Sequence, residues 1–142
     1  MSPELAFWDS SALIPLCVQQ SQTKRATTLF AAYGVAVWWS TPVEIVSGLT
    51  RLLRMGEIDE EEFLAGKHVA EIVAATWVVI KPSAKIATEA CSLLERYPLS
   101  AADALQLAAA LEWSENKPKG EVFLSFDQRL REAAGGTGFT LE

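Results

Sequence analysis

Apolar and polar residues alternate along the chain in blocks whose spacing predicts strands and helices in turn. Short, nearly uninterrupted apolar runs suit strands that are buried on both faces of a sheet. Such runs lie at 5–8, 35–39, 77–80 and 121–124, with a candidate edge strand at 137–141. Between these runs, apolar residues recur every three or four positions, which is typical of helices packed along one side. The helical stretches are 21–33, 40–56, 59–75, 83–96, 100–113 and 127–134, with a further helix starting after Asp9.

Small and polar residues mark where several of these elements begin and end. Gly34 is interpreted as the stop of a helix, and Gly135–Gly136 as a turn. Thr41 and Ser100 are interpreted as helix N-caps, because an acid stands three residues after each in the spacing of a capping box. Strands that alternate with helices predict a three-layer α/β/α fold around a mainly parallel sheet of four to five strands. The chain has no repeat and no linker, so we expect a single domain over residues 1–142.

The composition excludes several classes of protein. Half of the residues are hydrophobic, so a packed core is expected rather than intrinsic disorder. No apolar run approaches the roughly 20 residues that span a bilayer, and no basic segment precedes an apolar one at the start. Cys17 and Cys91 stand far apart and His68 is the single histidine, which argues against a disulfide framework or a zinc site. We expect a cytoplasmic protein without a membrane segment.

The formal net charge of −6 disfavours an electrostatic nucleic-acid binder, which normally presents a basic face. This objection weakens if several acids are metal ligands, because bound cations cancel and then reverse the local charge. Arg51 and Arg54, three apart on one predicted helix, offer contacts to phosphate. A solvated helix face is the simpler interpretation of both.

Three acids closely follow predicted strands. Asp9 comes directly after the first strand, Glu44 lies in the first turn after the second, and Asp127 stands three residues after Leu124. The carboxyl ends of parallel strands share one edge of the sheet, where ligands of open α/β folds bind. We therefore expect these three acids at the same edge. Asp103 follows a helix, and spacing alone does not place it there.

Each of these four acids also has a purely structural interpretation as a helix cap or a first-turn acid. However, converging carboxylates repel one another and raise some of their pKa values, which lowers stability unless a cation is bound. The convergence therefore favours a site for a hard metal ion with oxygen ligands.

In four segments of the chain, one of these acids is flanked by small or apolar residues. The segments are Phe7–Leu13 (FWDSSAL), Pro42–Leu49 (PVEIVSGL), Ala102–Ala108 (ADALQLA) and Leu124–Leu130 (LSFDQRL). Each motif is weak alone, but the four in this order, over nearly the whole chain, resemble the acidic motifs of the PIN-domain family and its VapC-type toxin ribonucleases. One departure is Gln106, where many relatives carry His; we interpret that position as tuning the site rather than building it.

The resemblance implies a PIN-like fold and a Mg²⁺- or Mn²⁺-dependent endoribonuclease. It implies that Asp9 and Asp103 bind the metal directly and that Asp103 joins the cluster. Glu44 and Asp127 bind it directly or through water, with Asp127 the least firmly assigned, and the number of metal ions stays open. A metal in such a site activates water and offsets charge on the phosphate. Ser10 and Ser125 are expected to donate to a ligand carboxylate or a phosphate, or to cap their helices.

The resemblance also implies partners. A VapC-type toxin is usually a homodimer and is inhibited by a cognate antitoxin, for which apolar residues on the helices between 40 and 75 offer a groove.

Two alternative functions remain open. A catalytically silent PIN-like module would only bind a protein partner, although all four acids are present. A phosphoacceptor receiver domain needs neighbouring acids after the first strand, where Ser10–Ser11 stand, and a lysine after the last strand, where Thr137–Phe139 stand.

Overall fold

The computed structural model describes residues 3–142, in which five strands form one sheet. The strand order is β3-β2-β1-β4-β5, and every neighbouring pair is parallel, with Ala6 opposite Val35 and Phe7 opposite Phe123. The strands are β1 (Leu5–Trp8), β2 (Gly34–Trp38), β3 (Val78–Ile80), β4 (Val122–Leu124) and β5 (Thr140–Leu141). The predicted edge strand is confirmed as β5, although it has only two residues.

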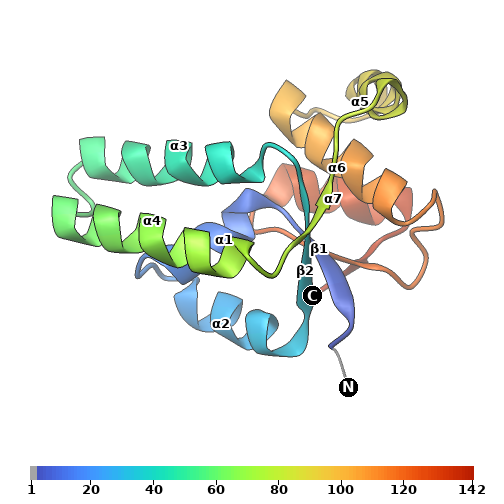
Figure 1. Cartoon of the computed structure of the whole chain (residues 1–142). Helices are drawn as coiled ribbons and strands as arrows, with labels where there is room; N and C mark the ends of the chain where they lie inside the picture. Colours follow the sequence, from blue (N-terminus) through green and yellow to red (C-terminus); the bar gives the residue numbers. More distant parts are fainter. Residues whose placement is uncertain (1–2) are drawn as a thin grey trace.

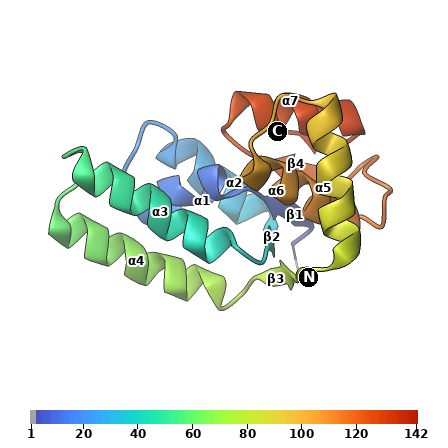
Figure 2. The same cartoon turned by 90° about the horizontal axis from the view of Figure 1, so that it is seen from above.

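Helices cover both faces of this sheet (Figure 1). Between residues 3 and 142 they are α1 (Ser10–Cys17), α2 (Thr23–Ala32), α3 (Thr41–Arg54), α4 (Glu60–Ala74), α5 (Ala84–Arg96), α6 (Ala101–Trp113) and α7 (Gln128–Thr137). Seen from above, α1 to α4 lie on one side of the strands and α5 to α7 on the other (Figure 2). The predicted three-layer α/β/α fold is confirmed.

Alternate residues of each strand supply the cores of the two layers. Ala6 and Trp8 of β1 pack into one buried cluster with residues of α1 and α3. Phe7, which points to the opposite face, packs into a second cluster with residues of α5, α6 and α7. Every β1 residue after Leu5 is therefore buried, which explains why the strand is a continuous apolar run instead of an alternating one.

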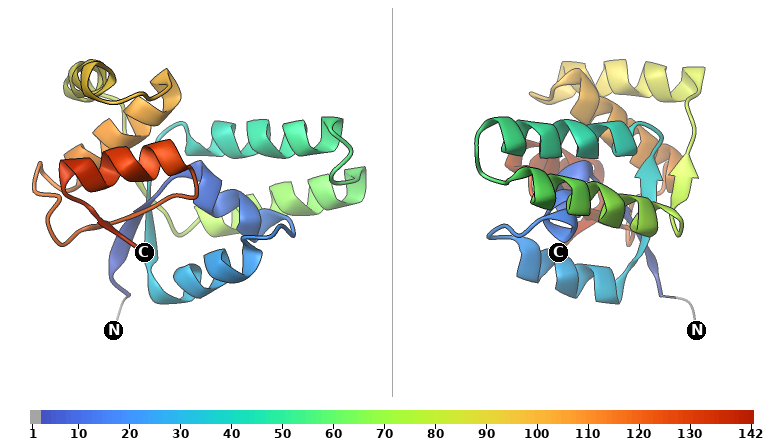
Figure 3. Two further views of the ribbon diagram at one scale, coloured as in Figure 1. Left: turned by 180° about the vertical axis from the view of Figure 1, so that it is seen from behind. Right: turned by 60° about the vertical axis from the view of Figure 1, so that its left-hand side comes forward.

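Helices α3 and α4 form an antiparallel pair that extends beyond the sheet (Figure 3). Two glycines allow this pair to pack closely on α1. A Cβ atom on Gly48 would lie 2.4 Å from Cδ1 of Ile14, and one on Gly66 would lie 3.1 Å from the carbonyl oxygen of Cys17. The close packing of α3 on α1 brings the beginning of α3 beside the beginning of α1.

The strand order also creates a crevice at the carboxyl ends of β1 and β4. From β1 the chain continues outward through β2 and β3, and then crosses to β4 and β5 on the other side of β1. The helix that follows β1 packs on one face, whereas α7, which follows β4, packs on the other. Ligands bind at such switch points in open α/β sheets, because the loops there diverge.

Three predicted boundaries are wrong. Gly34 does not stop α2; it is the first residue of β2, and its N–H donates to the carbonyl of Glu4. Gly135–Gly136 is not a turn but part of α7, where a Cβ on Gly136 would lie 2.8 Å from the hydroxyl of Tyr97. The helix ends instead at Gly138, whose φ of 114° suits only glycine well. Thr41 is not the N-cap of α3 but its first residue.

Within residues 3–142, no helix combines the length and the hydropathy that crossing a bilayer requires.

Candidate active site

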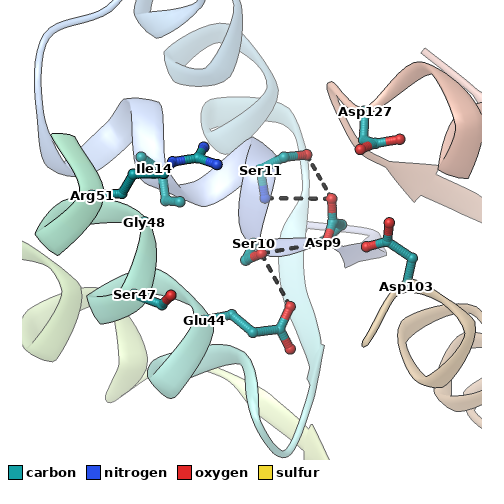
Figure 4. Close-up of a pocket in the computed structure, with 10 residues that line it drawn as sticks. All are labelled: Asp9, Ser10, Ser11, Ile14, Glu44, Ser47, Gly48, Arg51, Asp103 and Asp127. Atoms are coloured by element: carbon teal, nitrogen blue, oxygen red, sulfur yellow. Dashed lines mark hydrogen bonds between the residues drawn. The ribbon is translucent and has the colours of Figure 1, made fainter. Parts of the chain in front are cut away.

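The four predicted acids line one cleft of about 260 Å³ at the carboxyl edge of the sheet (Figure 4). Each acid comes from a different segment: Asp9 from the end of β1, Glu44 from the first turn of α3, Asp103 from the first turn of α6, and Asp127 from the residue before α7. The remaining lining residues are Ser10, Ser11, Ile14, Ser47, Gly48 and Arg51. The sheet topology therefore brings together the three acids expected from strand positions, and Asp103 joins them.

Asp9 lies at the bottom of the cleft and is 2% exposed. Its backbone N–H donates to the carbonyl of Leu124 at 2.9 Å, which extends the pairing of β1 with β4 by one residue. Its Oδ2 accepts hydrogen bonds from the hydroxyls of Ser11 at 2.6 Å and Ser125 at 2.9 Å. The hydroxyl of Ser10 lies 3.4 Å from Oδ1. The carboxylate is thus held in one orientation by neighbouring serines.

Burial raises the pKa of Asp9 to about 6. The hydrogen bonds from Ser11 and Ser125 act in the opposite direction, and the charges of Asp103 and Glu44 add to the increase. Asp9 also caps α1, since its side chain accepts from the N–H of Ser11. The predicted capping role is therefore confirmed for Asp9, which also lies in the cleft with the other three acids.

Glu44 is held by four donated hydrogen bonds. Its Oε2 accepts from the hydroxyl of Ser40 at 2.7 Å, and its Oε1 accepts from the hydroxyl of Ser10 at 3.3 Å. The side-chain amide of Gln106 lies 3.1 Å from both carboxylate oxygens. The capping box predicted for Thr41 and Glu44 is wrong, because Glu44 turns toward these groups and the Thr41 hydroxyl instead accepts from Gln106 at 3.2 Å.

Asp103 and Asp127 approach the cleft from the opposite side. Ser100 caps α6 by accepting from the N–H of Asp103 at 3.2 Å, which leaves the Asp103 carboxylate free to face the cleft. Partial burial, followed by the charge of Asp127, raises the pKa of Asp103. Asp127 caps α7 through a 3.0 Å hydrogen bond from the N–H of Leu130 and still lines the cleft.

The donor set suits a hard divalent cation. The cleft presents carboxylates and serine hydroxyls, without imidazole or thiolate, and burial, with a further contribution from the neighbouring negative charges, raises the pKa of Asp9 and Asp103. Over residues 3–142, no three acidic, cysteine or histidine side chains are gathered closely enough to enclose an ion. The four acids therefore line the walls of the cleft without forming a closed set of ligands.

Three residues outside the predicted set of metal ligands and supporting serines also lie at the site. Ser11 donates the shortest hydrogen bond to Asp9, and its position two residues after a helix-capping acid was the available signal. Gln106, interpreted as tuning, is fully buried and fixes Glu44. Arg51, interpreted as part of a solvated face, lines the cleft, whereas Arg54 does not. His68 is exposed on α4 and does not line the cleft either.

Ser10 and Ser125 both contact Asp9, which is one of the roles expected for them. Ser125 is buried and also accepts from the N–H of Asp127 at 3.0 Å, so it links two of the acids. Ser10 links two others, because its hydroxyl lies between Asp9 and Glu44. A small network of hydroxyls therefore sets the relative positions of Asp9, Glu44 and Asp127.

Fold and site together define an α/β/α domain with an acidic cleft at the switch point of a parallel sheet. The chain belongs to the PIN-domain family, whose sequence profile matches residues 6–136. The resemblance inferred from the four motifs is thereby confirmed. No curated protein gave a significant match to the chain.

Solved structures share this fold at low sequence identity. VapC20 of Mycobacterium tuberculosis, a sarcin–ricin loop cleaving toxin, is 20% identical with a TM-score of 0.66, and the match covers 95% of this chain and 96% of that one. A toxin–antitoxin complex from Klebsiella pneumoniae is 18% identical with a TM-score of 0.62, covering 87% and 88%. VapBC2 of Rickettsia felis, bound to a promoter DNA fragment, is 12% identical with a TM-score of 0.64, covering 97% of each chain.

Proposed function

We propose that this protein is a metal-dependent endoribonuclease of the VapC toxin type, which hydrolyses RNA phosphodiester bonds. The observation that carries the proposal is the convergence of four carboxylates, each from a different segment, on one cleft. Each acid separately has a structural explanation as a cap or a first-turn residue. A common structural role does not explain why all four face the same space, because their mutual repulsion lowers stability.

Asp9, Asp103, Glu44 and Asp127 would hold Mg²⁺ or Mn²⁺. When bound, such an ion supplies Lewis-acid chemistry, which acidifies water and offsets charge on the phosphate. The protein's own contribution is to fix the carboxylates in advance. Ser11 and Ser125 orient Asp9, while Ser40 and Gln106 orient Glu44, so little reorganisation is required when substrate binds.

RNA is proposed as the substrate because the fold neighbours include a sarcin–ricin loop cleaving toxin and because the chain belongs to the PIN-domain family, whose acidic motifs its four acids resemble. The net charge of −6 is compatible with this substrate if bound cations neutralise the cleft. We further propose that the protein acts in the cytoplasm as a homodimer.

An antitoxin is proposed as the protein partner, since structural neighbours are toxin–antitoxin complexes. On α3, the side chains of Val43 and Val46 are 71% and 41% exposed and form a shallow apolar depression with Pro42 and Ser47. Ser47 lines both this depression and the acidic cleft. A peptide bound along α3 would therefore lie beside the cleft and block access of RNA.

The proposal is tested by incubating the purified protein with RNA in Mn²⁺, in Mg²⁺ and in EDTA, beside Asp9→Asn. Asp59→Asn is the matched control, because Asp59 caps α4 on the surface and the change removes the same charge from the same kind of position. We expect metal-dependent cleavage by the wild type and the control, and its loss in Asp9→Asn. Intact RNA with the wild type in both metals, or equal cleavage by Asp9→Asn, would contradict the proposal.

A further inference from the structure

Arg51 is the single basic residue among those lining the acidic cleft in the described part of the chain. It follows Glu44 by seven positions on α3, so the two side chains leave the helix in directions that differ by only about 20°. Glu44, Ser47, Gly48 and Arg51 consequently form one stripe that faces the cleft. Arg54 lies about 80° away from the direction of Glu44 and points elsewhere.

The guanidinium of Arg51 is exposed and available for binding. Among residues 3–142 it takes part in no ion pair and no side-chain hydrogen bond, although four carboxylates line the same cleft. Figure 4 shows the side chain reaching past Ile14 toward Ser11 at the start of α1, with its guanidinium on the left of the view and not among the acids.

The position of Arg51 suits a second contact to the substrate. An anionic strand that approaches the four acids is repelled unless positive charge is placed near its path. A guanidinium binds phosphate oxygens through two parallel N–H donors. At the rim of the cleft, both donors of Arg51 are open to a phosphate of the substrate. Between Arg51 and Glu44 the wall of the cleft is formed by Ser47 and by Ile14, which packs against Gly48.

We propose that Arg51 binds a backbone phosphate of the RNA strand next to the scissile phosphate, and so positions the strand across the acidic cleft. This inference rests on the proposed function. It assigns a substrate-binding residue that contacts RNA independently of the metal site, and it identifies α3 as the wall along which the strand runs.

The test compares Arg51→Ala with Arg54→Ala, both made in the Asp9→Asn background so that the probe is not cleaved. Both changes remove one positive charge from the same helix, and only the first residue lines the cleft. Binding of a short fluorescein-labelled single-stranded RNA is measured by anisotropy in Mg²⁺ between about 50 and 250 mM NaCl. Arg51→Lys is the conservative variant, which keeps the charge but not the bidentate geometry.

We expect Arg51→Ala to weaken RNA binding about tenfold and to reduce the slope of log K against log[salt] by about 0.7, the value for one lost phosphate contact on a single strand. Arg54→Ala should change binding less than twofold, and Arg51→Lys should keep the slope. In the active protein, Arg51→Ala should raise KM more than it lowers kcat.

Equal weakening by the two alanine variants would show a general charge effect and overturn the inference, as would unchanged binding by Arg51→Ala. Either result leaves the proposed ribonuclease in place if the Asp9-dependent cleavage is observed. The absence of both RNA binding and RNA cleavage by the wild type would overturn the proposed function and this inference together.

Discussion

Gln106 is a fully buried polar side chain whose amide nitrogen reaches the carboxylate of Glu44 and the hydroxyl of Thr41. Its Oε1 has no hydrogen-bond partner in the described structure. A buried polar residue with an unsatisfied atom lowers stability, so its presence in α6 is better explained by what it does to Glu44 than by packing. We therefore assign Gln106 to positioning Glu44 and not to the core of the protein.

This assignment predicts that Gln106→Leu reduces the affinity for Mn²⁺ by about tenfold or more, because Glu44 loses its two hydrogen bonds from the amide. The melting temperature should change little, since the substitution also removes the unsatisfied Oε1. Gln106→His, which can keep an N–H donor, should bind Mn²⁺ nearly as the wild type does. Calorimetric titration and thermal melting check both parts, and unchanged Mn²⁺ affinity in Gln106→Leu would contradict the assignment.

At the scale of elements, the site depends on how closely α3 and α4 pack on α1. Gly66 is buried at this contact, and a side chain there meets Cγ1 of Val18 and the backbone of Cys17. We predict that Gly66→Val lowers the free energy of unfolding by about 1–3 kcal/mol, the usual cost of overpacking. Ala65→Val, on the exposed neighbouring position, is the control and should have a much smaller effect. Urea denaturation measures both variants, and equal stability would contradict the packing argument.

Periodicity was sufficient to predict the strands, most helices and the three-layer fold, because apolar runs and helical spacing directly reflect burial. It was not sufficient at Gly135–Gly136, where glycine serves close packing against Tyr97 rather than a turn. The capping box at Thr41 failed for a related reason. Partners that are distant in sequence, Ser10 and Gln106, compete for Glu44, and a local motif does not contain them.

The site residues also differ in how far the sequence predicts their positions. Asp9, Glu44 and Asp127 follow parallel strands, so topology alone places them at one edge. Asp103 reaches that edge because α6 packs across β2 and against α5 and α7, an arrangement that strand order does not specify. Only the resemblance of its motif to those of PIN domains placed it in the cluster. The spacing of Arg51 and Arg54 offered phosphate contacts for both but did not distinguish them, because the direction of one exposed side chain depends on the finished fold.

At the scale of the whole molecule, the buried Asp9 links stability to pH. Its pKa in the folded protein is raised to about 6, whereas in the unfolded chain it is close to the ordinary value of 3.8. The folded state therefore binds this proton more tightly. The protonated Asp9 carboxyl therefore stabilises the folded state fully below about pH 4, and this stabilisation is lost as the pH rises through about 6. The raised pKa of Asp103 acts in the same direction.

We predict that, in EDTA, Asp9→Asn melts at a higher temperature than the wild type at about pH 7.5 and that this difference shrinks toward about pH 4. Asparagine can still accept the capping hydrogen bond at the start of α1, so the helix is retained. Circular dichroism melts of both proteins across this range provide the measurement. A difference independent of pH, or a lower melting temperature for Asp9→Asn at neutral pH, would mean that Asp9 acts mainly as a cap.

The central claim is that the four carboxylates form a site for a divalent metal ion. Isothermal titration of Mn²⁺ into the wild type, Asp9→Asn and the surface control Asp59→Asn tests it most directly. We predict saturable binding to the wild type and to Asp59→Asn, with affinity lowered at least about tenfold in Asp9→Asn. Equal Mn²⁺ affinity in all three proteins, or no binding to the wild type, would contradict the claim.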